Sequence, residues 1–301
     1  MSSWGLVATV KAPEEELLAF VAYHLSLGAN RLWLYFDDPE DPAFDRISKL
    51  PQVTATRCTN WYWAWRGGRR EPLYLRQISN ALHAQSKCRL DWLGHIDVDE
   101  YLYASRPVAD ILAEMPKSVP NLRVEPFEAM HDASLPDDIF TARHFRGPLG
   151  AQYRVLHPEI FGPMAAVVSK GSLSHIIGKS FCRPRVPGMA IALHDVILNK
   201  QKLRTPFHPE LRLLHFHAQD PVGWRRALPF RLESGAYHFE EERQLHAFLS
   251  TADDKALQAF YDATMTLTPE KIALLQAQDR LITADLGLRA RVADLLAGRT
   301  G

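Results

Sequence analysis

The chain has 301 residues, of which 47% are hydrophobic and 23% are charged, as in an ordinary folded globular protein. Lysine and arginine total 35, and so do aspartate and glutamate, so the formal net charge is zero. A protein built mainly to bind nucleic acid normally has a basic excess, so this balance argues against that class and allows only a local basic patch. A chain of this length can form one large α/β domain or two smaller ones without disulfides.

The three cysteines, Cys58, Cys88 and Cys182, are far apart in the sequence and form no C-x-x-C pair. We interpret them as reduced thiols of a cytoplasmic protein. The first eleven residues lack the basic and apolar segments of a signal peptide. No apolar run approaches the roughly 18–20 residues that a membrane span needs. The sequence leaves open a peripheral association with the inner face of a membrane, and it does not determine the oligomeric state.

The first hundred residues alternate short apolar runs with amphipathic segments. Helices are expected from residue 13 up to Gly28 and from about 77 to 86. This order is typical of a largely parallel sheet with helices on its faces, which binds ligands at the carboxyl ends of its strands. Two acidic clusters, Asp37-Asp38 and Asp97 to Glu100, fall at such ends. The strands expected here are residues 5–10, 31–36, 53–58 and 92–97.

The second half of the chain changes character twice. Strand-like segments rich in proline, histidine and glycine run from about 121 to 219, and the pattern becomes helical after Asp220. We find no internal repeat and no low-complexity linker. The strands expected here are residues 122–127, 190–198 and 211–216, and the helices are residues 224–232, 243–249, 255–266 and 269–296.

The most distinctive local pattern is Trp92-Leu-Gly-His-Ile-Asp97-Val-Asp99-Glu100, an apolar run that leads into three acids. If the strand continues, side chains at i and i+2 share a face, so Asp97 and Asp99 would converge on one cation; a turn would aim them differently. Mg²⁺ and Mn²⁺ prefer oxygen ligands and commonly take one or two carboxylates together with substrate phosphates. Solvated acids at a strand end are the alternative interpretation, but the apolar lead-in and the third acid favour a metal site.

This apolar strand followed by Asp-x-Asp-Glu resembles the metal motif of glycosyltransferases with the GT-A fold, and more closely the family 2-like branch related to glycosyltransferase family 92. Other segments resemble that branch in the same order, so that four ordered motifs span roughly residues 5–235. The helix from Gln77 to Trp92 leads into the Asp-x-Asp strand and is counted with it. The three further motifs are Val10-Lys11 through Tyr23-His24 to Tyr35-Phe-Asp37-Asp38, Gly178-Lys179-Ser-Phe-Cys-Arg183-Pro184 with Ala192-Leu-His194, and Leu214-His215-Phe216 with Trp224 and Gly235.

The resemblance implies an α/β fold with a GT-A-like, Rossmann-type mixed sheet flanked by helices. The catalytic domain would cover residues 1–235, and a helical C-terminal extension over residues 236–301 would pack on it. Asp97 and Asp99 would hold Mn²⁺ or Mg²⁺, with His215 as the third protein ligand, because imidazole also suits Mn²⁺. The ion would act as a Lewis acid that neutralises the diphosphate of a nucleotide-sugar donor.

The resemblance also implies which residues contact the donor. Lys179 and Arg183 would stabilise the charge that develops on the diphosphate, which Asp97 would also help to bind. Contacts with the nucleobase or ribose would come from Asp37 or Asp38, with Lys11 facing the nucleotide.

The acceptor side departs from the pattern of the branch. Where the branch usually has Trp-x-x-Phe-Gly, this chain has Val124-Glu-Pro-Phe127-Glu128, which leaves the acceptor undetermined. An inverting enzyme needs a general base to deprotonate the acceptor hydroxyl. Of the nearby acids, which also include Asp132 and Asp137, we favour Glu128 or Asp138.

Two further patterns have more than one interpretation. The aromatic and basic run Trp61-Tyr-Trp63-Ala-Trp65-Arg66-Gly-Gly-Arg69-Arg70 could stack on sugar rings, contact membrane headgroups or form a covered loop. His217 could join His215 as a metal ligand or be a partly buried residue with one hydrogen bond, and we favour the second interpretation.

The sequence therefore predicts a metal-dependent, inverting glycosyltransferase that uses a nucleoside-diphosphate sugar, UDP-linked rather than GDP-linked. The acceptor would be a glycan or another hydroxyl compound in bacterial polysaccharide synthesis. One alternative is a metal-dependent nucleotidyltransferase or phosphoesterase that uses the same acids. The other is a non-catalytic protein that binds sugar nucleotides.

Overall fold

The computed structural model describes residues 1–136, 141–233, 235–238 and 240–299. The chain divides into two compact units, each assembled from separate stretches of sequence. Strands β6 (Asn121–Ala129) and β12 (Phe207–His215) each begin in the first unit and end in the second. The expected boundary between a catalytic domain and a C-terminal extension at residue 235 stays a prediction. The first unit comprises residues 1–125, 177–213 and 287–301, and the second comprises residues 126–176 and 214–286.

The first unit is built on a mixed sheet whose parallel part matches the predicted strands. β1 (Trp4–Val10) lies between β2 (Arg31–Phe36) and β4 (Trp92–His95) and is parallel to both, and β3 (Val53–Arg57) extends the sheet beyond β2. On the other side, β8 (Lys179–Cys182) is antiparallel to β4 and to β6. β5 (Glu100–Ala104) pairs with β12, which also pairs with β6. The expected α/β class with a mixed sheet is confirmed.

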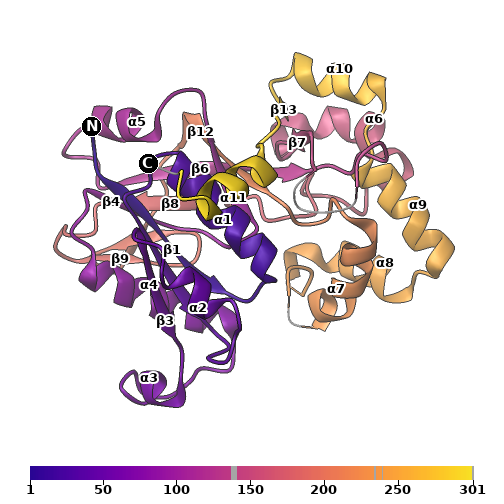
Figure 1. The fold of residues 1–301 in the computed structure, drawn as a ribbon. Helices are drawn as coiled ribbons and strands as arrows, with labels where there is room; N and C mark the ends of the chain where they lie inside the picture. The colour runs from indigo at the N-terminus through magenta and orange to yellow at the C-terminus, as the bar shows by residue number, and fades with distance from the viewer. Residues whose placement is uncertain (137–140, 234, 239, 300–301) are drawn as a thin grey trace. The chain divides into compact units, whose positions relative to one another are not determined.

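Helices complete the first unit, as Figure 1 shows. α1 begins with Glu14, Glu15 and Glu16, where carboxylates interact favourably with the helix dipole, and it buries its apolar face in the core of the sheet. The last helix of the chain returns to this unit: Arg291 lies over the Tyr23 ring at 5.2 Å, and Leu295 is part of the same core. The helices are α1 (Glu14–Ser26), α2 (Phe44–Ile47), α3 (Asn60–Ala64), α4 (Leu73–Lys87), α5 (Val108–Glu114) and α11 (Leu288–Leu296).

The strand predicted over residues 190–198 is two strands. β9 (Met189–Ile191) and β10 (Val196–Leu198) form an antiparallel hairpin, because the Ala192 N–H donates to the Asp195 carbonyl at 3.0 Å and closes a turn between them. β11 (Gln201–Leu203) adds a third strand to this small sheet.

The second unit has a short three-stranded part, in which β7 (His144–Arg146) pairs with the end of β6 and with β13 (Leu281–Thr283). The single helix predicted over 269–296 is therefore interrupted, because Asp279 has a left-handed φ of 53° and the chain then forms β13. The helices of this unit are η1 (Ala151–Leu156), α6 (His157–Phe161), η2 (Gly162–Met164), α7 (Pro221–Glu233), η3 (Glu240–Glu242), α8 (Arg243–Thr251), α9 (Asp254–Met265) and α10 (Pro269–Ala277).

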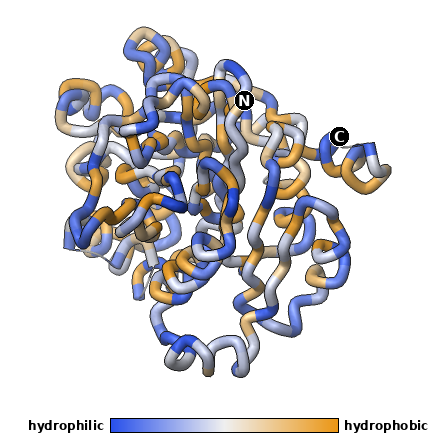
Figure 2. Tube along the Cα trace, turned by 90° about the vertical axis from the view of Figure 1, so that its left-hand side faces the viewer, coloured by the Kyte–Doolittle hydropathy of each residue, from blue (hydrophilic) through white to orange (hydrophobic). Residues whose placement is uncertain are grey.

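The second unit has its own hydrophobic core around Trp224, which stacks on Phe260 and contacts Tyr261. Its helices have conventional starts: the Asp253 carboxylate accepts from Ala256 N–H, and the Thr268 hydroxyl caps α10 in front of Pro269. Hydrophobic and hydrophilic residues are interspersed along the whole trace (Figure 2).

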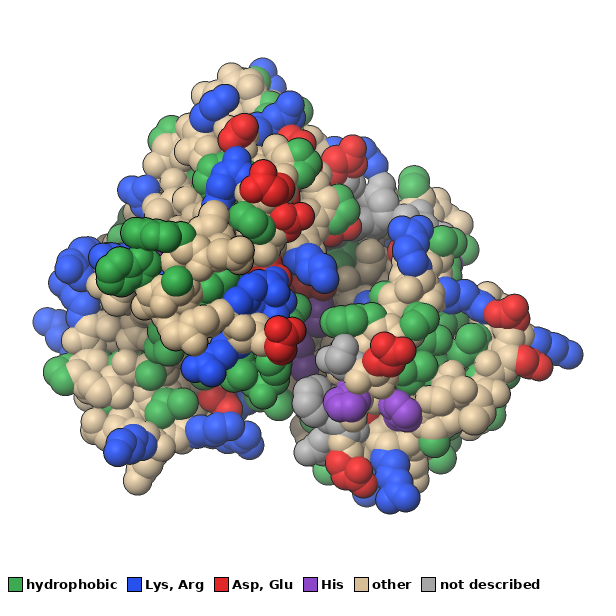
Figure 3. Space-filling view, turned by 90° about the horizontal axis from the view of Figure 1, so that it is seen from below, with side chains coloured by type: hydrophobic (Ala, Val, Ile, Leu, Met, Phe, Trp, Pro, Cys, Tyr) green, Lys and Arg blue, Asp and Glu red, His purple; other side chains and the backbone are tan. Residues whose placement is uncertain are grey.

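Lysine, arginine and acidic side chains are interspersed over the face drawn in Figure 3, in line with the zero net charge. Among the described helices, none combines the length and the apolar character that crossing a bilayer requires.

Candidate functional site

The carboxyl ends of β1, β2, β3 and β4 meet at one edge of the first unit's sheet, because these four strands are parallel. Lys11 follows β1, Asp37 and Asp38 follow β2, and Asp97 comes two residues after β4. The predicted residues Lys11, Asp37 and Asp38 line one open pocket of about 360 Å³. The other residues that line this pocket are Pro39, Cys58, Asn60 and Arg69.

Asp37 is held by two arginines. Arg76 of α4 donates from Nε to Oδ1 at 2.8 Å and from Nη2 to Oδ2 at 2.9 Å, and Arg69 donates from Nη2 to Oδ2 at 2.9 Å. Such a two-point ion pair is strong and geometrically specific. Asp37 is buried and its oxygens are committed to these donors, so its direct effect is to fix Arg69 at the pocket. Asp38 is exposed at the same pocket.

The Asp-x-Asp motif lies in a turn, so the strand does not continue through it. β4 ends at His95 and β5 begins at Glu100. The Glu100 carboxylate accepts from Asp97 N–H at 2.7 Å, and the Glu100 N–H donates to the Asp97 carbonyl at 3.1 Å. Asp97 and Asp99 therefore do not share one face of a strand, and the third acid of the motif closes the turn.

Lys179 lies beside this turn. The antiparallel register of β8, which pairs Leu93 with Cys182 and Gly94 with Phe181, brings Lys179 to the end of β4. Its ammonium is 2.6 Å from Asp97 Oδ2 and 3.4 Å from Glu100 Oε2, and its side chain is only 1% exposed. The structure thus brings Asp97 and Lys179, both predicted, into one cluster with Glu100.

The charges of this cluster stabilise one another. Burial alone would raise the pKa of Asp97, but the adjacent Lys179 ammonium holds it well below its ordinary range. Burial alone would lower the pKa of Lys179, but Asp97 and Glu100 raise it above its ordinary value. Both groups are therefore ionised at neutral pH. Gln77 of α4 donates to Asp97 Oδ1 at 2.6 Å and fixes the carboxylate further.

The cluster has an excess of negative charge that fits a divalent cation. Asp97, Asp99 and Glu100 carry three formal negative charges, and Lys179 carries one positive charge, which leaves a formal charge of −2. A carboxylate has about four acceptor sites, and the two side-chain donors described above occupy two of those on Asp97. Because the Asp97 side chain is 29% exposed, it keeps acceptor capacity for Mg²⁺ or Mn²⁺, which prefer oxygen ligands.

Glu16 of α1 adds a fourth acid near this turn. Burial, together with the negative charge of Asp99, raises its pKa to about 7. His95, the last residue of β4, is buried with Nδ1 2.8 Å from the Ala192 carbonyl. Burial, together with the Lys179 ammonium, lowers its pKa to about 4, so this histidine is neutral at physiological pH.

Arg183 does not accompany Lys179. It follows the opposite end of β8, where its guanidinium donates to the Val119 carbonyl at 3.2 Å and the Met115 carbonyl at 3.0 Å. It also lies 4.2 Å above the Trp92 ring. Lys179 and Arg183 are four residues apart, and an extended strand of that length separates them by roughly 13 Å. We therefore do not assign Arg183 to donor binding.

Glu128, favoured from the sequence as a general base, is enclosed in the second unit. Its side chain is 1% exposed and accepts from Arg146 Nη2 at 2.5 Å and from the N–H groups of Leu173 and Ser174 at 3.0 and 3.2 Å. A base must reach the hydroxyl that it deprotonates. With both oxygens bound inside the unit, Glu128 is a structural residue. Asp138, the other favoured base, and Asp137 lie outside the described residues.

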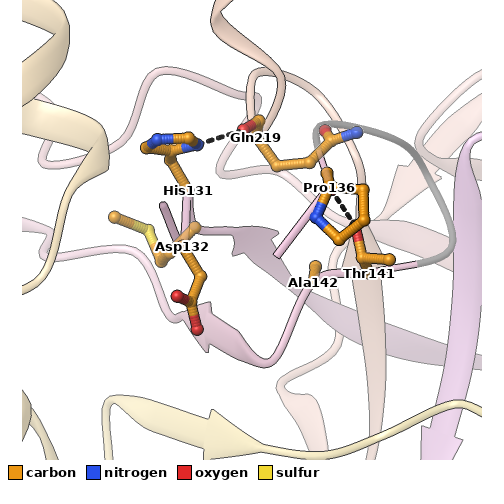
Figure 4. Close-up of a pocket in the computed structure, with 7 residues that line it drawn as sticks. His131, Asp132, Pro136, Thr141, Ala142 and Gln219 are labelled. Atoms are coloured by element: carbon orange, nitrogen blue, oxygen red, sulfur yellow. Dashed lines mark hydrogen bonds between the residues drawn. The ribbon is translucent and has the colours of Figure 1, made fainter. Parts of the chain in front are cut away.

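Asp132 is the remaining acid of that group. It lies at a small pocket of the second unit next to His131, whose Nδ1 is 3.1 Å from the Gln219 carbonyl (Figure 4). Hydrogen bonds from Ser134 lower the pKa of Asp132 below its ordinary value. A lowered pKa makes this carboxylate a weaker base.

The predicted metal ligand His215 also belongs to the second unit. Its ring lies 5.2 Å from that of His175 and 5.3 Å from that of His217. His217 makes a hydrogen bond of 3.0 Å between Nε2 and the Tyr237 hydroxyl, which matches the interpretation of a partly buried histidine with one hydrogen bond. The role of His215 beside Asp97 and Asp99 stays a prediction.

Sequence reasoning missed the residues that hold the acids in place, which belong to α4 and to the arginine-containing loop before it. Arg76, Gln77 and Asn80 bind Asp37, Asp97 and Thr9, respectively. The sequence signal that could have indicated them is a set of polar residues at helical spacing on a helix face that is otherwise apolar and buried. Arg69 was visible only as part of an aromatic and basic run.

Comparisons with known proteins identify no family for this chain. No model of a known protein family matches it, and no curated protein is a match. Among solved structures, HddC from Yersinia pseudotuberculosis is 12% identical, with a TM-score of 0.38 over 75% of this chain and 98% of that one. Residues 1–349 of S. aureus TarS are 11% identical, with a TM-score of 0.39 over 97% and 88% of the two chains. Likenesses this small carry no argument about function.

Proposed function

We propose that this protein is a metal-dependent glycosyltransferase that takes a sugar from a nucleoside diphosphate. The observation that carries the proposal is the arrangement of charges along one sheet edge. Lys11 and the acids Asp37 and Asp38 follow neighbouring parallel strands, and the buried Lys179 forms ion pairs with Asp97 and Glu100 at the end of β4. Carboxyl ends of parallel strands are where α/β sheets bind nucleotides.

The residues divide into two groups with different tasks. The pocket lined by Lys11, Asp38 and Arg69 has the volume and the hydrogen-bonding groups for a nucleoside, with Arg69 fixed by Asp37. The cluster around Asp97 would face the diphosphate. The chemistry that a divalent cation supplies there is neutralisation of the leaving diphosphate, with Asp97 and Asp99 as its ligands and His215 as a proposed third.

Lys179 keeps its proton throughout, because its raised pKa disfavours proton transfer at neutral pH. Its fixed positive charge would stabilise the negative charge that grows on the diphosphate as the bond to the sugar breaks. Its buried ion pairs hold it in place before the reaction, so little reorganisation is needed.

The finer parts of the proposal rest on the sequence resemblance. They are a UDP-linked donor, inversion at the anomeric carbon, a glycan or other hydroxyl acceptor, and a place near the family 2-like branch related to glycosyltransferase family 92. The proposed cytoplasmic setting rests instead on the three separated cysteines. Asp138 stays the predicted base, whereas Glu128 is not proposed again because it is enclosed.

The first experiment is thermal-shift binding of UDP, GDP, CDP and ADP, each with and without Mn²⁺ or Mg²⁺. A ligand at a hundred times its Kd stabilises by about 2.7 kcal/mol, which is readily detected. We expect one nucleotide to raise the Tm only when metal is present, and Asp99→Asn to abolish the shift. Asp254→Asn, at an exposed position of α9, is the matched control and should leave the shift unchanged. No shift with any nucleotide, with metal present and the protein folded, overturns the assignment.

The products distinguish this reaction from the alternatives. Glycosyl transfer breaks the bond between the anomeric carbon and the diphosphate and releases a nucleoside diphosphate. A phosphoesterase hydrolyses a bond to phosphorus and releases a nucleoside monophosphate and a sugar phosphate. A nucleotidyltransferase moves the nucleoside monophosphate group to an acceptor such as pyrophosphate and releases the sugar phosphate. Chromatography of a nucleotide-sugar incubation separates these outcomes, and binding without any turnover favours a non-catalytic protein.

A further inference from the structure

The segment after β3 displays two tryptophans. All seven tryptophans of the chain lie among the described residues, and five of them are buried. Trp61 and Trp65, by contrast, are 73% and 74% exposed. They are four residues apart around α3, which places them on one face of the helix, and their ring centroids are 5.5 Å apart.

The opposite face of α3 is firmly anchored. Trp63 is buried in the hydrophobic cluster of this unit, and the Tyr62 hydroxyl donates to Asn80 Oδ1 at 2.7 Å. The Thr59 hydroxyl caps the helix by accepting from Tyr62 N–H at 3.1 Å. Trp61 and Trp65 are therefore held outward on a fixed base and do not belong to a loosely packed loop.

The same segment concentrates positive charge. Residues 60–70 contain Arg66, Arg69 and Arg70 and no acidic residue, in a chain whose overall net charge is zero. Arg70 is exposed, and Arg66 lies 3.7 Å from the centre of the Tyr62 ring. We call residues 60–70 the tryptophan–arginine tip.

We propose that the tryptophan–arginine tip docks this protein on an anionic lipid bilayer. Tryptophan prefers the headgroup level of a bilayer, where its apolar ring is buried while its N–H stays near water. Arginines next to it are attracted to the negative surface potential of the membrane, each contributing roughly fivefold to binding. The tip combines both features at one place in the fold, in the lower part of Figure 1 where α3 lies.

Two other occupants fit the tip less well. The planes of Trp61 and Trp65 are inclined by 65°, so the two rings do not form a common flat platform for stacked sugars. A neutral sugar also gives no reason for three neighbouring arginines. A second copy of the chain would bring the exposed arginines of two tips together, which costs free energy because like charges repel.

Docking would also affect the pocket at the sheet edge, because Asn60 and Arg69 belong to both the tip and the lining of that pocket. The inference does not depend on the proposed reaction. Vesicle binding is measured without any nucleotide, so a failure here leaves the glycosyltransferase proposal untouched.

Flotation with phosphatidylcholine vesicles, with and without about a third of phosphatidylserine, tests the inference directly. We expect the full-length protein to float only with the anionic vesicles, less so at high salt because salt screens the attraction. Binding should shift the tryptophan emission to the blue. Trp61→Ser combined with Trp65→Ser should lower the partition coefficient at least tenfold, and Arg70→Gln about fivefold.

Matched controls separate the tip from a general surface effect. Val155→Ser removes an exposed apolar side chain elsewhere, and Arg243→Gln removes an exposed arginine; both should bind vesicles as the natural protein does. Circular dichroism of each variant checks folding. Absent flotation with anionic vesicles, or flotation that survives the double tryptophan substitution, overturns the inference. An emission shift with soluble oligosaccharides but not with vesicles would also overturn it and would identify a sugar-stacking surface.

Discussion

Two buried ion pairs, one in each unit, contain the same kinds of groups but differ in access. The Glu128–Arg146 pair is 1% exposed on both sides, and backbone N–H groups complete the hydrogen bonding of the carboxylate. In the Asp97–Lys179 pair the ammonium is equally buried, but the carboxylate is partly exposed at the sheet edge. We interpret an ion pair whose two side chains are both buried as structural, and an ion pair with one partly exposed side chain as a candidate site.

The difference matters because burying a charge is costly unless partners compensate it. Glu128 and Arg146 compensate each other fully, and Arg146 also donates to the Thr264 carbonyl at 2.8 Å. In the cluster around Asp97 the three acids outnumber the single ammonium, and the Asp97 side chain is 29% exposed. Such an arrangement persists more easily where a cation or a charged ligand completes it.

The largest expected effect comes from breaking the enclosed pair. Arg146→Met leaves Glu128 as a buried charge, so we expect a loss of about 3–5 kcal/mol in the free energy of unfolding. Denaturant titration measures it. Arg146→Met combined with Glu128→Gln should recover much of that loss, because no charge is then left without a partner. If the single and double variants are equally destabilised, packing and not charge accounts for the effect.

Breaking the open pair should cost less and should reveal the ion. Lys179→Met leaves Asp97 and Glu100 without their ammonium, but Asp97 can be solvated, so we expect a loss of about 1–3 kcal/mol. Because the formal charge of the cluster falls from −2 to −3, added Mn²⁺ should raise the Tm more in this variant than in the natural protein. Equal Mn²⁺ shifts in both proteins would contradict a cation site at this turn.

The open cluster should also carry a pH dependence through Glu16. Its pKa of about 7 lies above the value of an unfolded chain, so the folded state binds more protons between about pH 4.5 and 7. Stability should therefore fall as the pH rises through this window and then level off. Glu16→Gln removes the ionisable group and with it this loss of stability. At pH 8 the variant should be more stable than the natural protein by about 1–2 kcal/mol, a figure that allows for the partial exposure of Glu16. At pH 4.5 the two proteins should be about equally stable. Melting curves in chelator would show it; a constant difference at all pH values would contradict it.

The smallest effect is expected at the surface, where ion pairs are screened by water. Arg225 and Asp254 are 2.8 Å apart, but the aspartate side chain is 97% exposed. Arg225→Gln should leave the Tm unchanged, because exposed ion pairs contribute little. A clear fall in Tm would show that exposure alone does not separate the structural pairs from the weak ones.

Much of the first unit could be predicted because its signals are local. Short strand-like runs gave β1, β2 and β3 to within a residue or two, and they placed Lys11 and Asp37 at one edge. The turn at Asp97 was only one of two options, because a single residue between two aspartates does not decide between strand and turn.

The remaining differences come from interactions between distant residues. Glu128 was a candidate base until Arg146 and two distant N–H groups were found to enclose it. Arg183 is close to Lys179 in sequence, but the extended strand between them carries it to the opposite end of β8. No sequence periodicity reports such partners, since they depend on how strands pair.

The first unit is assembled from three stretches of sequence, and its last helix, α11, adds Leu295 to the core that β1 begins. During synthesis on the ribosome, β1 and α1 emerge long before the residues that complete their packing. Until then part of the apolar surface of the parallel strands is exposed to solvent, which favours aggregation or chaperone binding. The core closes only after α11 has joined it, and the rate of this step should be limited by contacts between residues far apart in the chain.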